Sequence, residues 1–358
     1  MLKKLSFFAA ILSLILLTSC STDFSLNAPY KRTPVVFGLL DQNDSIHFVK
    51  ITRTFLGEGD NNEFAQVADS SYFDQVDAKV YEINTNGDTL RQWQLHDTII
   101  PNKESGTFYA PDQKVYVFYA NDLDQTMTYG FGAILDEGKY AVNAQTQLIE
   151  NFSFSFIVTS PGFTFSFGSA TSTSTGNYGS FISSYTEGKH GALYNTKIDI
   201  RYRETYADGS TSDKVIAWSK GDVIQEKPES PSSATINFGG EEFYTTIKGN
   251  LTVDNNVIKR QILGLDLVTA IAHTEFAKYM EISQPSSGIT QSTPQYTNIN
   301  NEGEDGALGL FSSRHIVSVK NIQLSSGAME ELCTGQHTGT LGFCSTYPEH
   351  STKSFYCN

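Results

Sequence analysis

Basic residues are scarce in this chain of 358 residues, in which 25 lysines and arginines stand against 39 aspartates and glutamates. Removing residues 1–19, a candidate signal peptide, leaves 23 basic residues and a formal charge of −16. Nucleic-acid binding needs a basic surface to meet the phosphates, and contact with anionic lipid needs a polybasic segment. The composition therefore argues against nucleic acid as a partner and against a protein that lies flat on anionic lipid.

Recognisable catalytic motifs are also missing. The chain has no Gly-x-Ser-x-Gly nucleophile elbow, no His-Glu-x-x-His helix and no Gly-rich phosphate loop, and its seven histidines are scattered. Only Trp93 and Trp218 carry an indole, which weakens a sugar-stacking interpretation. A pair of carboxylates at glycosidase spacing stays open, because the sequence does not show which acids meet. We predict a protein that is not an enzyme and needs no cofactor.

No apolar run is long enough for a transmembrane helix, which needs about 20 apolar residues. Leu5 to Leu17 form a short apolar segment behind two lysines, which is typical of a secretory signal. The segment ends in Leu-Thr-Ser-Cys20, which resembles the lipobox of bacterial lipoproteins, where the cysteine thiol is acylated, for example by palmitate. We expect a signal peptide over residues 1–19, lipid attachment at Cys20 and a tether over residues 20–33. A free Cys20 behind an ordinary signal peptide is the alternative.

The rest of the chain shows β-strand patterns. Residues 34–148 contain several short alternating segments separated by turn signals, such as Asn86-Gly87, which predicts a β-sandwich. Residues 149–332 predict a larger, mainly β domain with a few short helices. In this second region two runs of alternating phenylalanines predict strands that face a core, with a ligand-stacking surface as the alternative: Phe152, Phe154 and Phe156, then Phe163, Phe165 and Phe167.

A Ser/Thr/Gly-rich segment from Gly168 to Gly191 is longer than the loops that compact domains usually need. We expect a surface loop that presents three aromatic candidates for partner binding, Tyr178, Phe181 and Tyr185. A surface loop without a partner is equally consistent with the sequence. The acidic segment Asn298 to Asp305 is a second candidate surface.

Three cysteines gather in the tail over residues 333–358: Cys333, Cys344 and Cys357. A secreted protein meets an oxidising compartment, so one disulfide and one unpaired cysteine is the simplest prediction, with the pairing left open. A zinc site with His337 and His350, or free thiols, are the alternatives. The spacings match no standard zinc finger, and we expect no metal site.

Three segments resemble one family beyond the lipobox: TPVVFGLLDQNDSIHFVKITRTF (residues 33–55), YGFGAILDEGKYAVNAQT (129–146) and PQYTNINNEGEDGALGLFSSRH (294–315). The family is an uncharacterised group of Bacteroidota lipoproteins that share a domain of unknown function, and the resemblance covers roughly residues 33–324. It implies an N-terminal immunoglobulin- or transthyretin-like sandwich, a larger mainly β domain and no catalytic residues. Its members are often encoded beside TonB-dependent outer-membrane receptors.

The anchor and the resemblance together predict a binding protein of the outer membrane, lipid-anchored and exposed at the cell surface. Asp23, just after the anchor, resembles the acidic signals that send such lipoproteins to the surface; the periplasmic face is the alternative. The expected partner is an outer-membrane β-barrel protein, first a TonB-dependent nutrient importer. The alternatives are a scaffold subunit of an assembly or secretion machine, and a surface glycan-binding protein or hydrolase.

Overall fold

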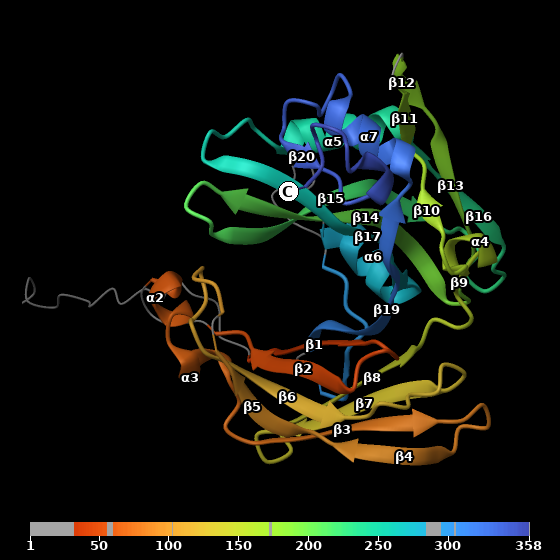
Figure 1. Cartoon of the computed structure of the whole chain (residues 1–358). Helices are drawn as coiled ribbons and strands as arrows, with labels where there is room; N and C mark the ends of the chain where they lie inside the picture. Colours follow the sequence, from red (N-terminus) through yellow and green to blue (C-terminus); the bar gives the residue numbers. More distant parts are fainter. Residues whose placement is uncertain are drawn as a thin grey trace, which may run out of the picture.

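The computed structural model describes residues 32–55, 60–101, 103–171, 174–283, 295–303 and 306–357. It is mainly β, with several sheets and few short helices, as predicted (Figure 1). The signal peptide, Cys20 and nearly all of the tether lie outside the described residues. None of the helices formed by the described residues is long and apolar enough to cross a membrane.

The largest sheet connects the two ends of the chain. In order of pairing, its strands are β15 (Thr211–Ile224), β14 (Gly191–Tyr206), β17 (Val257–His273), β19 (Leu308–Leu324), β1 (Pro34–Leu40), β2 (Ile46–Arg53), β6 (Gln113–Tyr119) and β5 (His96–Ile100). Two short strands attach to it, β10 (Thr164–Phe165) at β19 and β20 (Phe343–Cys344) at β17. Residues 308–313 of β19 pair in parallel with β1, and residues 314–322 pair with β17. A single strand therefore links the lower and upper parts of the molecule in Figure 1.

A second sheet lies below β1, β2 and β6 in Figure 1, and its strands are β18 (Asn300–Asn301), β8 (Tyr140–Gln147), β7 (Thr128–Leu135), β3 (Val76–Ile83) and β4 (Thr89–Gln94). Alternate side chains from both sheets meet between them and form what we call the first core. The rings of Phe131 and Phe311, for example, have their centroids 5.4 Å apart.

The upper part contains the second core, which is built on β14, β17 and the end of β19. A small sheet of β16 (Ser233–Gly239), β13 (Ser180–Thr186) and β9 (Ser153–Phe154) packs against it, beside the hairpin of β11 (Gly168–Thr171) and β12 (Ser174–Tyr178). Leu148 belongs to the first core and Ile149 to the second. Ile299 and Phe311 return to the first core, so residues 34–148 do not build it alone. The division into domains at residue 148 stays a prediction.

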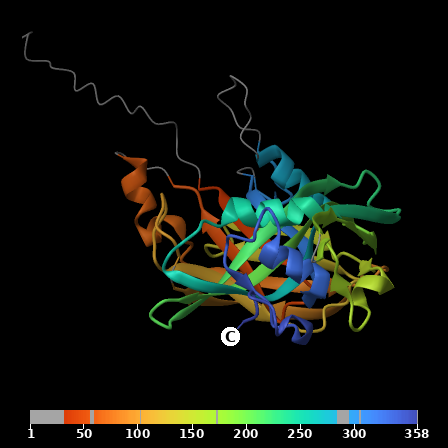
Figure 2. The same ribbon diagram turned by 45° about the horizontal axis from the view of Figure 1, so that its top comes forward.

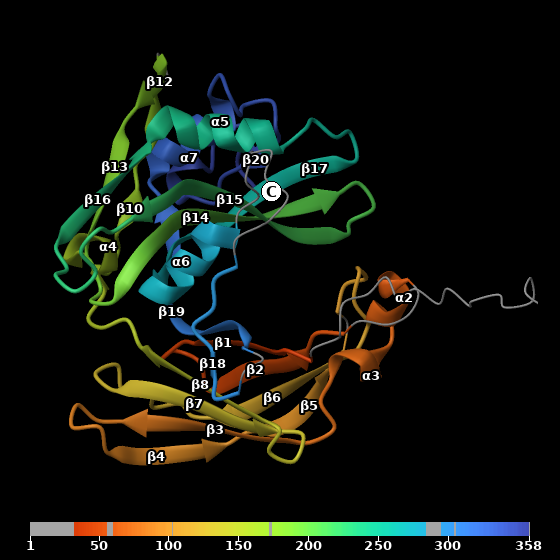
Figure 3. The same cartoon turned by 180° about the vertical axis from the view of Figure 1, so that it is seen from behind.

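The helices are short, and their bounds are α2 (Asn61–Ala65), α3 (Ala68–Ser71), α4 (Phe156–Thr159), α5 (Gly240–Asn250), α6 (Thr274–Ser283), α7 (Ser326–Thr334) and a 3₁₀ turn (Pro348–His350). Figure 2 shows α5 and α7 side by side, where the hydroxyl of Tyr244 donates to the carbonyl of Ala328 at 3.0 Å. Seen from behind in Figure 3, α6 lies close to β19.

The structure differs from the sequence predictions in two segments. Phe154, Phe165 and Phe167 are core residues as predicted, but Phe156 is 81% exposed because the chain leaves β9 and begins α4 at that residue. The expected loop from Gly168 to Gly191 is wrong over most of its length, since it forms β11, β12 and β13.

Candidate binding pocket

An apolar hollow lies on the outer face of β1 and β2. Val36, Leu40, Val49 and Ile51 alternate inward to the first core, so their neighbours along each strand point outward. The antiparallel register places Phe37 opposite Lys50 and Val35 opposite Thr52. Two apolar side chains, one lysine and one threonine therefore form the floor of this hollow, which we call the cationic pocket.

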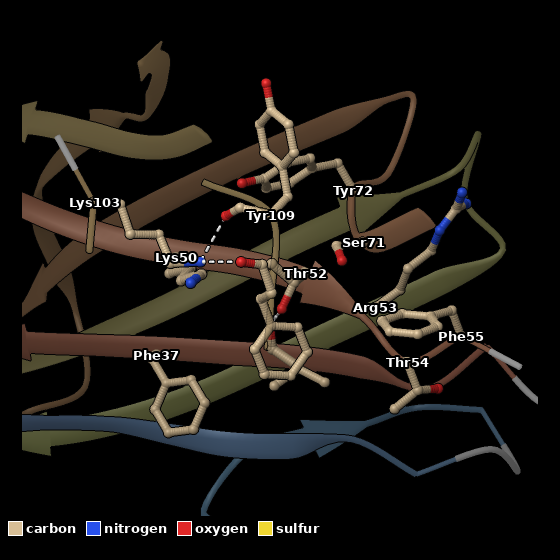
Figure 4. A pocket seen from close by; sticks show the side chains of 12 residues that line it. Phe37, Lys50, Thr52, Arg53, Thr54, Phe55, Ser71, Tyr72, Lys103 and Tyr109 are labelled. Carbon is tan, nitrogen blue, oxygen red and sulfur yellow. Dashed lines mark hydrogen bonds between the residues drawn. The ribbon is translucent and has the colours of Figure 1, made fainter. Parts of the chain in front are cut away.

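Segments that are distant in sequence form the walls of the cationic pocket. Its cavity volume is about 390 Å³, within the range of small-molecule sites. Figure 4 shows the lining residues, which are Val35, Phe37, Lys50, Thr52, Arg53, Thr54, Phe55, Ser71, Tyr72, Lys103, Phe108 and Tyr109. Tyr72 follows α3, and Lys103 to Tyr109 belong to the segment between β5 and β6.

Among the residues that the structure describes, three of those lining the pocket are cations and none is a carboxylate. The ammonium of Lys103 is held by the carbonyls of Tyr109 at 2.7 Å and Phe108 at 3.3 Å. Figure 4 shows the ammonium groups of Lys50, from the floor, and Lys103, from the wall, next to each other. In a chain with a formal charge of −14, this is a local excess of positive charge.

The side-chain ammonium of Lys50 has no hydrogen bond or ion pair with any residue that the structure describes. Burial, and secondarily the charge of Lys103, lower the pKa of Lys50 below its ordinary value. The side chain is therefore held in a surrounding that disfavours its charged form. An anion beside it would oppose this shift, because a nearby negative charge favours the charged form.

Arg53 closes the far end of the cationic pocket. Its guanidinium donates to the backbone carbonyls of Asp69 at 2.9 Å and Ser70 at 3.3 Å, which ties β2 to α3. Its Nη1 is buried and has no hydrogen-bond partner among the described residues. Arg53 positions α3 against the sheet and leaves one donor unused.

A second hollow of about 250 Å³ continues from the first, because Val35 and Phe37 line both. Its other side is formed by Tyr279 of α6, by Tyr296 and by Leu308 of β19. The rings of Phe37 and Tyr279 meet edge to face, with centroids 5.7 Å apart. An apolar groove thus runs from the two lysines to α6.

The three aromatic candidates of the sequence lie in or beside β-strands, away from this groove. Tyr185 is 3% exposed and its ring lies 5.8 Å from that of Tyr194. Phe181 packs on Phe165 with ring centroids 4.9 Å apart. Tyr178, the last residue of β12, donates to a carboxylate oxygen of Glu331 at 3.2 Å. Their display on a flexible loop is therefore wrong, and their role in binding a partner stays a prediction.

The tail contains one disulfide, Cys344–Cys357, which confirms the predicted staple and supplies the pairing that the sequence left open. Cys333 is a buried free thiol in α7, and burial raises its pKa to about 12. Cys344 and Cys357 are joined in the disulfide, so neither can serve as a zinc ligand in the zinc alternative. Across the part of the chain that the structure describes, no group of three or more His, Cys, Asp or Glu side chains could hold a metal ion.

The cationic pocket is not visible in the sequence, for a definable reason. The turn at Asp41 to Asp44 fixes the register of β1 and β2, so Phe37 and Lys50 could have been placed on one face from the sequence. Lys103 comes from a segment more than 50 residues away, and no local pattern indicates that it meets Lys50.

No protein-family model matches the chain, and no curated protein is similar enough in sequence to count as a relative.

Proposed function

We propose that this chain is a non-enzymatic, lipid-anchored outer-membrane protein that binds a ligand and works with an outer-membrane β-barrel, first a TonB-dependent importer. The observation that carries the proposal is the cationic pocket: an apolar hollow of ligand size with a few polar groups on one wall. The lipobox and the family resemblance supply the location and the partner.

The position of the cationic pocket suits a protein that works at a membrane. Val35, on its floor, is the second residue of β1, directly after the expected tether. A tether over residues 20–33 spans at most ~50 Å when fully extended. The start of β1 would then lie at most ~50 Å from the lipid surface. At that distance the cationic pocket is within reach of a barrel in the same membrane.

The finer architecture forms part of the same proposal. We assign the first core and its two sheets to the expected immunoglobulin- or transthyretin-like sandwich, with residues around Phe311 added from the C-terminal part. The second core would be the larger domain. The pairing of β1 with β19 supports a body in which both parts are presented to a partner as one unit.

Co-purification from detergent-solubilised outer membrane tests the proposal. We expect the tagged full chain to retain a transporter barrel, and Cys20→Ser to lose membrane attachment after a carbonate wash. An assembly or secretion barrel in its place would favour the scaffold alternative. A solitary protein that turns over or binds glycans would favour the surface-hydrolase alternative.

A further inference from the structure

We propose that the cationic pocket binds an amphiphilic anion: a flexible apolar chain that ends in a carboxylate or phosphate group. The inference rests on the proposed function and names the ligand class for the same site. It assigns the charged head to Lys50 and Lys103 and the apolar chain to the groove that passes Phe37.

The head group follows from the unmatched charge. Lys103 already donates to two carbonyls, and the ammonium of Lys50 donates to no group among the residues that the structure describes. A carboxylate or phosphate oxygen placed between them would accept charge-assisted hydrogen bonds, which are about twice as strong as neutral ones. No carboxylate among the described lining residues competes for that position. The site therefore selects for negative charge.

The apolar part follows from the shape of the groove. Phe37, Phe55 and Phe108 line the first hollow, and Phe37 is 37% exposed although it lies in the middle of β1. The second hollow extends the apolar path to Tyr279 of α6. Covering these surfaces is favourable in proportion to the apolar area removed from water. A small anion without a chain would leave them exposed.

Other ligand classes fit less well. A neutral sugar would leave the ammonium of Lys50 unpaired, and a cation would be repelled by three positive side chains. A magnesium-bound nucleotide needs oxygen ligands for the ion, and the part of the pocket wall that the structure describes offers no carboxylate.

The experiment measures acylation of individual lysines in the folded full chain by mass spectrometry, with Lys50 as the reporter. A lysine of lowered pKa reacts readily with acetic anhydride near neutral pH, and an anion at its ammonium protects it. The probes are dodecanoate, dodecyl phosphate, dodecyltrimethylammonium and inorganic phosphate. Lys248, an exposed residue of α5, is the internal control.

We expect dodecanoate or dodecyl phosphate to protect Lys50 in a saturable manner and to leave Lys248 unprotected. The preferred head group is that of the amphiphile that half-protects Lys50 at the lower concentration. Lys103→Gln should raise that concentration roughly tenfold or more, as loss of one charged partner does. Phe37→Ser should raise it as well, and Lys248→Gln should leave it unchanged. Melting curves of each variant verify folding.

Three results would overturn the inference. The first is that neither anionic amphiphile protects Lys50. The second is that dodecyltrimethylammonium protects Lys50 as well as the anionic amphiphiles do. The third is that inorganic phosphate alone protects it at the same concentration as the amphiphiles. These results leave the barrel partnership intact, because co-purification is scored separately on wild type and Lys50→Gln. If instead the wild-type chain co-purifies with no barrel while the amphiphile still protects Lys50, the proposed function is rejected and the ligand class stands.

Discussion

The side-chain amide of Asn298 pairs with both backbone groups of Phe311. Its Nδ2 donates to the Phe311 carbonyl at 2.7 Å, and its Oδ1 accepts from the Phe311 N–H at 2.9 Å. The next residue, Ile299, and the ring of Phe311 are both buried in the first core. One asparagine therefore takes the place of a strand partner for Phe311, in the part of β19 that pairs with β1 and belongs to the first core.

We expect Asn298→Ala to lower the free energy of unfolding by about 2 kcal/mol, because two hydrogen bonds of ~1 kcal/mol each are lost. Asn300→Ala is the matched control: Asn300 is exposed, its amide makes only a 3.5 Å contact with Asn143, and its loss should cost under ~0.5 kcal/mol. Urea denaturation measures both. Equal effects of the two substitutions would contradict this role of Asn298.

The sequence was informative wherever structure depends on neighbouring residues. Asn86-Gly87 does form the turn between β3 and β4, with the Gly87 N–H donating to Asn84 at 3.0 Å, and Gly87 has a φ of +88°. The few short helices expected over residues 149–332 include α5 and α6. Turn chemistry and helical spacing act over a few residues, so they are visible in the sequence.

The pairing of β1 with β19 could not be predicted in this way, because its partners are far apart in the chain. Val36 pairs with Gly309, where a Cβ atom would lie 1.9 Å from the Val36 carbonyl oxygen. The glycine is required by this close approach and not by a turn. From the sequence alone, the two requirements look the same.

Close approach also explains the error over the segment from Gly168 to Gly191. A Cβ on Gly168 would lie 2.9 Å from the ring of Tyr244, and one on Gly240 would lie 1.9 Å from the carbonyl oxygen of Phe167. The small residues allow strands and α5 to pack tightly. From the sequence alone this composition predicts a loop, because Ser, Thr and Gly also favour loops.

Acid should destabilise the protein through His273. Burial, and secondarily the neighbouring His190, lower the pKa of His273 to about 4, while Glu229 acts in the opposite direction and Lys278 adds to the lowering. Its Nδ1 accepts the backbone N–H of Glu275 at 3.2 Å in the first turn of α6, which a protonated ring could not do. Between the unfolded pKa of ~6.5 and about 4, the unfolded chain binds a proton that the folded chain does not.

The free energy of unfolding should therefore fall as the pH is lowered from 6.5 to 4, by roughly 3 kcal/mol from this group. His273→Asn keeps an acceptor for the helix and does not titrate, so its stability should depend less on pH in that range. His96→Asn, at an exposed site, is the control and should follow wild type. Denaturation curves at several pH values provide the measurement, and an unchanged slope in His273→Asn would refute the assignment.

The cysteines of the tail should behave differently from one another. The Cys344–Cys357 disulfide closes a loop with a sequence separation of 13, and the double change to serine should cost about 2–3 kcal/mol. Burial raises the pKa of Cys333 to about 12, so little thiolate is present at neutral pH. Without reductant, iodoacetamide should label Cys333 only after denaturation. Rapid labelling of Cys333, Cys344 or Cys357 in the folded protein would show that α7 opens readily or that the pairing is different.

Tyr185 should be a stability residue of β13 and not an exposed contact. It is 3% exposed, packs between Phe152 and Tyr194, and pairs with Phe154 across the sheet. Tyr185→Ala should lower the free energy of unfolding by about 3 kcal/mol or more, as for other large buried aromatics. Ile182, on the opposite face of the same strand, is 60% exposed, so Ile182→Ala should cost under ~0.5 kcal/mol. Urea denaturation of the two variants compares the faces directly.

If Ile182→Ala unfolds as easily as Tyr185→Ala, the outer face of β13 is covered in the folded protein and the packing argued for Tyr185 is wrong.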